Sequence, residues 1–160
     1  MPTPAPALAV VARTPAPPVV PIGRAVLEGI RDGRFDPPAT ATLLGLDLID
    51  VGEGTTAFRF RPDARFDNGA GVSHGGILAT VADFAVTTAV ATVAPEGALA
   101  STAQLNVNYL RPVRTGGAPV LGTGRVVRAG RSVAHAEATI TDADGRTCVT
   151  ASAVIHLAGP

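Results

Sequence analysis

One carboxylate stands alone in the longest apolar stretch of the chain. Asp83 is the only charged residue between positions 75 and 94, where the other residues are aliphatic, small, threonine or phenylalanine. Burying a lone carboxylate costs free energy unless it is partnered or protonated, so Asp83 is a candidate general base or nucleophile. The alternative is that Asp83 lies on a small exposed stripe with Thr80, Thr87 and Thr88.

A glycine-rich segment precedes this stretch and could polarise a carbonyl group. Residues 68–76 read NGAGVSHGG and lead directly into the apolar run. The first turn of a helix leaves backbone N–H groups unpaired at its positive end, where they can stabilise a developing oxyanion. Glycine-rich turns before helices are also common structural features, and a histidine such as His74 can merely cap or pack.

The spacing of the two features bears on how they could work together. At about 100° and 1.5 Å per residue, His74 and Asp83 would lie on opposite faces of one helix, roughly 13 Å apart along its axis. They could not easily meet in one site within one subunit. If both act in catalysis, two helices from two chains should pack together. A homodimer with two shared sites is the expected assembly.

The charges are unevenly distributed. The chain has 13 basic and 13 acidic residues, so its formal net charge is zero, which argues against a generally basic nucleic-acid binder. Residues 97–136 nevertheless contain no acid. The arginines of that segment are Arg111, Arg114, Arg125, Arg128 and Arg131. An acid-free segment of this kind suits phosphate binding, although solvated strand faces are the simpler alternative.

Residue patterns predict an α+β protein with one antiparallel sheet wrapped on a long helix. The predicted helices cover 22–34 and 74–94, the second with Ser73 as N-cap, and a short apolar turn covers 39–46. An irregular loop is expected at 62–73. The predicted strands cover 47–51, 55–61, 101–110, 119–128, 131–141 and 146–157, with a hairpin turn at 52–54.

Composition sets the expected boundaries and compartment. Residues 1–21 hold seven prolines and are expected to form a flexible Pro/Ala-rich tail before a single domain at 22–160. The only cysteine, Cys148, is expected to be a packed, inert thiol in a strand, without a disulfide. The apolar stretch contains Asp83, which makes a membrane span a weak interpretation. A soluble cytoplasmic protein is the simplest expectation.

Taken together, these residues resemble the hotdog-fold acyl-CoA thioesterases, specifically the PaaI-like (phenylacetate-degradation) branch. The resemblance runs from about residue 37 to 157 and is strongest in the ordered set Asn68-x5-His74-Gly75-Gly76-x6-Asp83. It continues through STAQLNVNYLRPV (101–113), Gly130-Arg131 and DADGR (142–146). The family's hotdog fold, a long helix wrapped in a curved antiparallel sheet, agrees with the predicted order of elements. Family members are dimers or dimers of dimers with active sites between subunits.

The resemblance implies a role for each matching residue. Asp83 would activate a water or attack the thioester, and the Gly75 N–H would polarise the thioester carbonyl. Asn68 and His74 would position that carbonyl or the water from the other subunit, and Thr102 would assist the water. The substrate-binding candidates are Gly76, Arg111 and Arg131, the two arginines for the CoA phosphates. The sequence departs from the family at Gly69, often proline, and at Gln104, often acidic.

The expected function is hydrolysis of an acyl-CoA to free acid and CoA without a metal or redox cofactor. The expected partners are the acyl-CoA substrate and further copies of the chain, as a dimer or a dimer of dimers, with no nucleic acid and no membrane. Two other functions stay open: a non-catalytic acyl-CoA-binding or regulatory hotdog module, and a hotdog dehydratase or hydratase. The sequence leaves aryl, short and medium-chain acyl groups equally open.

Overall fold

The computed structural model describes residues 22–159, and the tail predicted at 1–21 lies outside the described residues. Its helices are α1 (Arg24–Arg31), α2 (Ala39–Leu44), the single 3-10 turn η1 (Ala64–Phe66) and α3 (Gly75–Ala91). Its strands are β1 (Leu46–Gly52), β2 (Thr55–Phe60), β3 (Leu99–Tyr109), β4 (Val120–Ala129), β5 (Val133–Thr141) and β6 (Thr147–Ala158).

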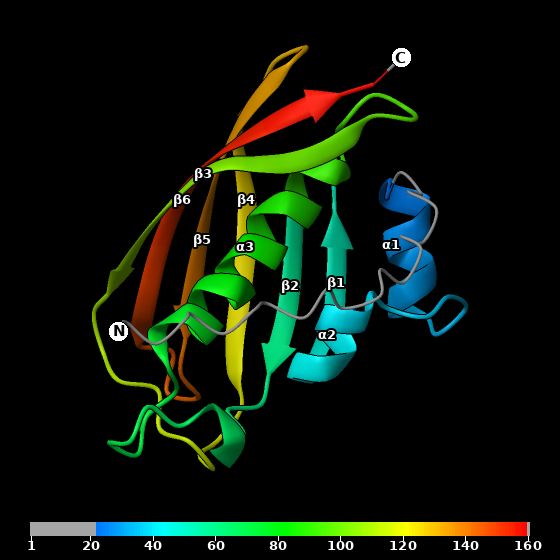
Figure 1. The fold of residues 1–160 in the computed structure, drawn as a ribbon. Helices are drawn as coiled ribbons and strands as arrows, with labels where there is room; N and C mark the ends of the chain where they lie inside the picture. Colours follow the sequence, from blue (N-terminus) through cyan, green and yellow to red (C-terminus); the bar gives the residue numbers. More distant parts are fainter. Residues whose placement is uncertain (1–21, 160) are drawn as a thin grey trace, which may run out of the picture.

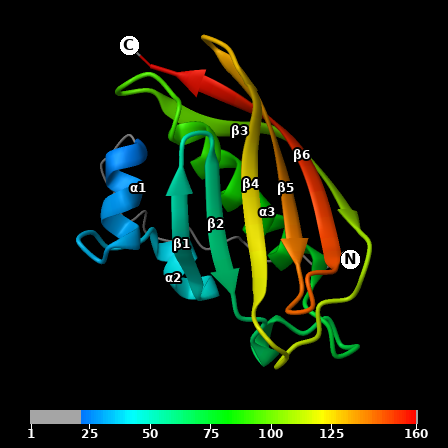
Figure 2. The same ribbon diagram turned by 180° about the vertical axis from the view of Figure 1, so that it is seen from behind.

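The six strands form one antiparallel sheet in the order β1-β2-β4-β5-β6-β3. The sheet curves around α3, which crosses its inner face, as Figure 1 and the reverse view in Figure 2 show. β1 and β3 are the two edges of this sheet. The α+β prediction, with one antiparallel sheet wrapped on a long helix, is confirmed.

Alternation along β2 explains why this segment becomes a strand with one face in the core. Thr56, Phe58 and Phe60 are buried, whereas the residues between them are exposed or half-buried. This period of two places the aromatic side chains against α3 and the arginine Arg59 toward solvent.

Two glycines of β4 allow α3 to lie close to the sheet. A Cβ at Gly124 would collide with the backbone carbonyl of Ala85, and a Cβ at Gly122 would lie 3.0 Å from Val81 Cγ1. Val81 and Ala85 are fully buried. The missing side chains therefore fix the depth of α3, and with it the position of Asp83 two residues beyond Val81.

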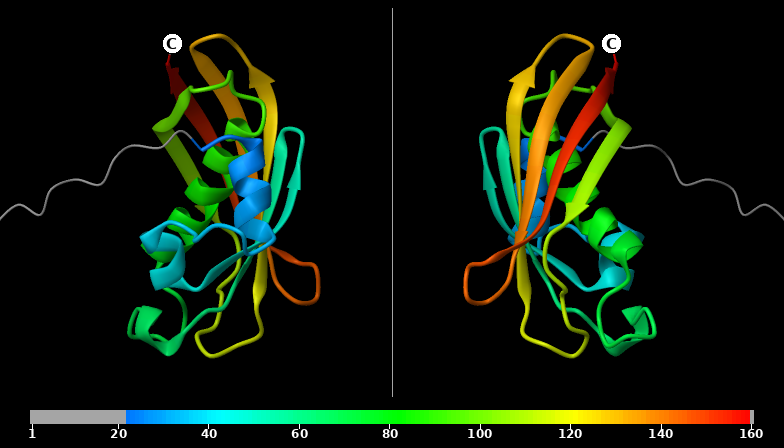
Figure 3. Two further views of the ribbon diagram at one scale, coloured as in Figure 1. Left: turned by 90° about the vertical axis from the view of Figure 1, so that its right-hand side faces the viewer. Right: turned by 90° about the vertical axis from the view of Figure 1, so that its left-hand side faces the viewer.

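The N-terminal helices form a separate cover at the β1 side of the sheet. Leu27 of α1 packs with Val51 and Ala91 in a small cluster distinct from the main core. Figure 3 shows α1 and α2 lying beside α3 rather than within the sheet. This cover becomes one wall of the cavity described below.

The structure differs from the sequence prediction at all three helices. The helix predicted at 22–34 spans only Arg24–Arg31. The short apolar turn predicted at 39–46 is instead helix α2 over residues 39–44, which Gly45, with φ of 65°, ends as a left-handed C-cap. Helix α3 ends at Ala91, three residues earlier than predicted. The prediction that Ser73 caps α3 is wrong: the N-cap is His74, and the Ser73 hydroxyl is buried without a hydrogen-bond partner among the described residues.

The prediction that Cys148 is packed within a strand is confirmed. Cys148 lies in β6, is 1% exposed and forms no disulfide, and its burial raises the pKa of the thiol. Within residues 22–159, no helix is both long and apolar enough to cross a membrane.

Candidate active site

Asp83 is half-buried on α3, and a hydroxyl group from β3 holds its carboxylate. Thr102 Oγ1 donates a hydrogen bond to Asp83 Oδ1 at 2.6 Å. A β-bulge between Thr102 and Gln104 changes the face that β3 presents to the core. Thr102 therefore faces α3 at the bulge, and the structure brings together the two residues that the resemblance paired.

A second hydroxyl extends this arrangement. Thr87 Oγ1 lies 3.0 Å from Thr102 Oγ1. Thr102 has one hydroxyl proton, and an ionised carboxylate can only accept, so Thr102 donates to Asp83 and Thr87 must donate to Thr102. Sequence reasoning grouped Thr87 only with an exposed stripe. Its spacing of four residues from Asp83, which places both on one helix face, was the available signal.

The other two threonines near Asp83 serve the backbone of α3. Thr88 is buried and donates to the Phe84 carbonyl at 2.6 Å, while Thr80 donates to the Gly76 carbonyl at 2.9 Å. Asp83 and these threonines therefore do not form an exposed polar stripe. The carboxylate faces a mixed environment of hydroxyl groups and apolar side chains.

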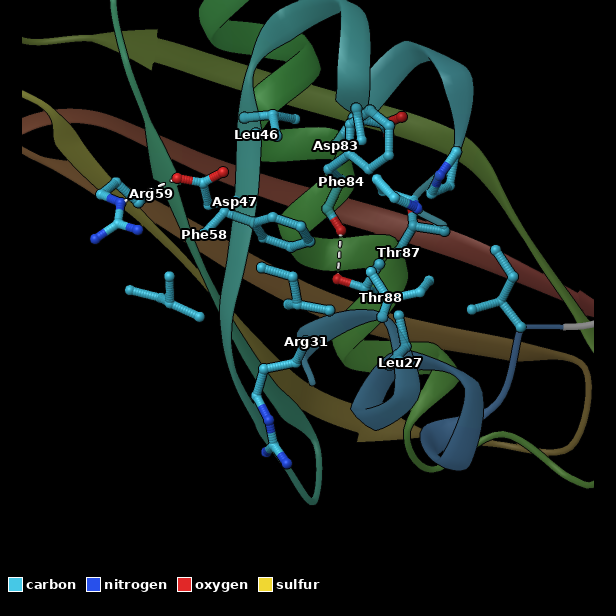
Figure 4. Close-up of a pocket in the computed structure, with 17 residues that line it drawn as sticks. Leu27, Arg31, Leu46, Asp47, Phe58, Arg59, Asp83, Phe84, Thr87 and Thr88 are labelled. Carbon is cyan, nitrogen blue, oxygen red and sulfur yellow. Dashed lines mark hydrogen bonds and ion pairs between the residues drawn. The ribbon is translucent and has the colours of Figure 1, made fainter. Parts of the chain in front are cut away.

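Asp83 lines a cavity of about 540 Å³ between α1, α2, β1, β2 and α3. Figure 4 shows Asp83 and Thr87 on the α3 side and Leu27 on the opposite, α1 side. Most of the wall is apolar: Ile22, Leu27, Ile30, Pro37, Pro38, Ala41, Leu46, Leu48, Ile49, Phe58 and Phe84. A carboxylate at the wall of an apolar cavity of this size fits a site that holds a small organic ligand.

The glycine-rich loop is built from short turns ahead of α3. Asn68 Oδ1 accepts a hydrogen bond from the Ala70 N–H at 2.9 Å, and Asp67 Oδ1 accepts from the Gly69 N–H at 2.6 Å. Gly69 has φ of 91°, a conformation that proline, fixed near −65°, cannot adopt. A proline at this position would not fit the loop conformation of this chain.

The N-terminus of α3 exposes one unused backbone donor. His74 Nδ1 accepts from the Gly76 N–H at 3.2 Å, whereas the Gly75 N–H makes no hydrogen bond with residues of the described part of the chain. Tyr109 covers the same turn, because its hydroxyl donates to the Gly75 carbonyl at 2.7 Å. Sequence reasoning assigned no role to Tyr109, although it lies in the matched segment 101–113.

Glycine at position 75 also leaves room for a neighbouring side chain. A Cβ there would lie 3.1 Å from Tyr109 Cζ and 3.2 Å from its hydroxyl oxygen, so the ring would have to shift. The glycine thus allows an aromatic ring to lie against the first turn of α3. The Gly75 N–H itself has no hydrogen-bond acceptor among the described residues.

One chain does not bring the loop and the carboxylate together. Asn68, His74, Gly75 and Gly76 are all absent from the walls of the cavity that Asp83 lines. The loop lies at the start of α3, and Asp83 lies in the middle of the helix. This separation agrees with the prediction that the two features do not meet within one subunit.

The two candidate phosphate-binding arginines lie at opposite ends of the sheet. The backbone N–H of Arg111 donates to the Cys148 carbonyl near the start of β6. Near the end of β6, the Leu157 N–H donates to the carbonyl of Ser132, the residue next to Arg131. Those β6 positions are nine residues apart, or roughly 30 Å along a strand. A single chain therefore does not place both arginines on one phosphate group.

Arg111 and Arg114 lie on the same side of the molecule as the glycine-rich loop. Arg111 Nη1 donates to the Thr147 carbonyl at 2.7 Å, and Arg114 forms a β-bridge with Val72. A second cavity of about 500 Å³ is lined by both arginines and by Arg146. Sequence reasoning named Arg114 only as part of the acid-free segment.

An acid of another segment neutralises one arginine of the acid-free segment 97–136, and Arg146, beyond that segment, is also paired. Arg125 Nη2 lies 2.7 Å from Glu137 Oε2 across β4 and β5. Arg146 contacts Asp142 and Asp144, both at 2.8 Å, and its backbone N–H lowers the pKa of Asp142. The acid-free segment is therefore only partly an unneutralised surface. Among residues 22–159, no three His, Cys, Asp or Glu side chains form a metal-binding group.

The fold and the site together define a class of protein. A curved antiparallel sheet around one long helix, with this strand order, is the hotdog fold. The chain matches the Thioesterase superfamily over residues 70–149, half of its length. It belongs to that superfamily, as the sequence resemblance predicted.

Individual relatives support the same assignment. The chain is 36% identical over 109 residues to a protein of Halobacterium salinarum named as an esterase, covering 64% of this chain and 70% of that protein. The crystal structure of a Ralstonia eutropha protein, named as a thioesterase and as related to phenylacetic acid degradation, matches with a TM-score of 0.74 and 28% identity, covering 81% of this chain and 98% of that one. A Streptococcus mutans protein bound to acetyl-CoA matches with a TM-score of 0.65 and 24% identity, covering 71% and 89%.

Proposed function

We propose that this protein is an acyl-CoA thioesterase that uses Asp83 as its catalytic carboxylate. The observation that carries the proposal is the position of Asp83, held by Thr102 at the wall of an apolar cavity. Membership of the thioesterase superfamily supports the reaction type. The acetyl-CoA bound to the similar Streptococcus mutans protein supports a CoA ester as the substrate class.

The proposed reaction adds water across a thioester bond. An acyl-CoA and a water molecule give a carboxylic acid and CoA: the C–S bond breaks, a C–O bond forms, and the sulfur takes up a proton. The Thr102 hydroxyl fixes Asp83 Oδ1, and no described residue donates a hydrogen bond to Oδ2. Asp83 Oδ2 is therefore available either to take a proton from the water or to attack the carbonyl carbon.

We propose that the carbonyl oxygen is bound by the loop of a second subunit. The unused Gly75 N–H at the positive end of α3 would stabilise the oxyanion. Asn68 and His74 would position the reacting groups, and Gly76 would lie beside them in the same substrate-binding turn. A second copy is needed because one chain keeps this loop out of the Asp83 cavity.

The free edge of the sheet supports self-association. Within residues 22–159, β3 pairs only with β6, and it carries no charged residue along its 11 positions. Natural proteins usually protect exposed edge strands with charges, proline or bulges. β3 has one bulge, at Thr102–Gln104, but no charge and no proline, so the rest of this long edge favours pairing with another chain. Tyr109 and Leu110 at its end are more than half exposed, at 52% and 55%. We propose that two copies associate along this side.

Phosphate binding follows from the same arrangement. Arg111 lies at the end of the sheet that carries the Gly75 loop and would contact the phosphates of the CoA held there. Arg131 lies at the other end, so it would reach the same ligand only from another subunit.

The test is release of CoA thiol from a panel of acyl-CoA esters by the wild type and by Asp83→Asn. The wild type should release thiol, and Asp83→Asn should lose at least about a hundredfold in kcat while keeping its thermal melting temperature. Near-wild-type turnover of Asp83→Asn would overturn the mechanism. Saturable binding of acyl-CoA without thiol release by the wild type would show a non-catalytic binding module instead.

A further inference from the structure

The cavity beside Asp83 has features that select among acyl groups. It extends from Asp83, Phe84 and Thr87 on α3 to Leu27 and Ile30 on α1 (Figure 4). Phe58 and Phe84 pack at a ring-centroid distance of 6.1 Å along its wall. An acyl group whose carbonyl lies at Asp83 would therefore extend over apolar surface toward α1.

The charged residues at the cavity do not offer a partner for a charged acyl group. Arg59 Nε lies 3.1 Å from Asp47 Oδ2, and Arg31 Nε lies 2.8 Å from Asp32 Oδ1. Figure 4 shows the guanidinium groups of Arg31 and Arg59 directed away from the apolar interior. A second carboxylate on the acyl chain would enter an apolar space without an available cation, at a cost in desolvation.

The size of the cavity excludes a close fit to a short acyl group. Its volume is about 540 Å³. If a methylene group takes about 30 Å³, as a water does in the liquid, an acetyl group would fill roughly a ninth of that space. A ten-carbon acyl chain would fill roughly half on the same basis, which is closer to the dense packing that protein interiors reach.

We infer that the substrate of this site carries an apolar, uncharged acyl group of about eight to twelve carbons, bound beneath α1. The inference rests on the proposed thioesterase activity. Each additional methylene that enters the cavity should raise kcat/KM by up to about fourfold. Octanoyl-CoA and decanoyl-CoA should therefore exceed butyryl-CoA by at least about tenfold.

The experiment measures kcat/KM for acetyl-, butyryl-, octanoyl- and decanoyl-CoA, each below the concentration at which it forms micelles. Ile30→Trp places an indole in the cavity and should lower the ratio of decanoyl to butyryl activity at least about tenfold. Ile30→Ala enlarges the space and should move the optimum toward longer chains. Ala25→Trp is the matched control, because Ala25 is exposed on the same helix and does not line the cavity.

The outcomes separate this inference from the proposed function. Thiol release from no ester by the wild type would refute the thioesterase itself. Efficient hydrolysis with a flat profile, or with acetyl-CoA preferred, would overturn the inference and leave the thioesterase standing. An equal loss of selectivity in Ala25→Trp would likewise overturn the assigned position beneath α1. Melting temperatures of the variants identify any that do not fold, and Ile30→Ala then carries the test.

Discussion

Replacing Gly75 by proline removes one backbone N–H while keeping the backbone geometry of α3. Gly75 is the first residue of the helix, a position that proline favours because its N–H has no intrahelical partner. The preceding residue, His74, has φ of −56° and ψ of 135°, a conformation allowed before proline. Since the Gly75 N–H bonds to nothing within residues 22–159, its loss breaks no described hydrogen bond.

The effect on stability should be small, and Gly75→Ala measures it. Either substitution places a Cβ 3.1 Å from Tyr109 Cζ, so the ring must move by a few tenths of an ångström. Tyr109 is 52% exposed and has room to do so. We expect each variant to lose no more than about 1 kcal/mol of unfolding free energy, the lower end of the cost of overpacking.

The effect on turnover should differ sharply between the two variants. Losing one backbone donor to an oxyanion costs about a hundredfold to a thousandfold in kcat, or roughly 2.7–4 kcal/mol. Gly75→Ala keeps the N–H and should retain activity within about tenfold, the range expected from a small displacement of the reacting groups. Steady-state thiol release gives kcat and KM, and circular dichroism melting gives the stability. Equal kcat values for the proline and alanine variants would refute the role of this N–H.

Three further predictions concern single residues. Thr102→Val removes the hydroxyl that donates to Asp83 at 2.6 Å. A charge-assisted hydrogen bond contributes about 1.5–3 kcal/mol, so its loss should lower kcat at least tenfold, and Thr102→Ser, which keeps the hydroxyl, should restore kcat. A change in KM alone would contradict this role. Gly124→Ala forces a Cβ against the Ala85 carbonyl and should destabilise the fold by about 1–3 kcal/mol; an unchanged calorimetric Tm would contradict the close approach of α3. Because burial raises the pKa of Cys148, a thiol reagent at pH 8 should modify it in urea but not in the native protein, and rapid native labelling would contradict its burial.

Sequence patterns predicted the elements whose faces alternate or repeat clearly. The alternating residues of β2 and the small, aliphatic run of α3 leave little choice of structure, because one face or the whole element must be buried. Helix α2 was missed because its six residues are too few to show a clear helical period and carry no charge at either end. The left-handed conformation with which Gly45 ends the helix is seen only in the structure. Ser73 was chosen as N-cap by residue type, although the neighbouring His74 side chain provides the cap.

Site residues could be predicted only where they carry a distinctive side chain. Asp83 stands out by its charge in an apolar run, but the contact that orients it depends on a β-bulge beside Thr102, which no local pattern in β3 reveals. Thr87 gains its role only through Thr102, from a different element. The Tyr109 contact with Gly75 likewise joins residues 34 positions apart. Contacts of this kind follow from sheet register rather than from spacing along the chain.

The central claim is that Asp83 of one subunit acts on a thioester held by the Gly75 loop of another. It is tested most directly by refolding Asp83→Ala and Gly75→Pro chains together in equal amounts. Each variant alone should be nearly inactive. In a two-fold dimer, half of the mixed assemblies would be heterodimers with one intact site of two, so thiol release should recover to about a quarter of the wild-type rate. No recovery in a mixture shown to contain heterodimers would contradict a site shared between subunits.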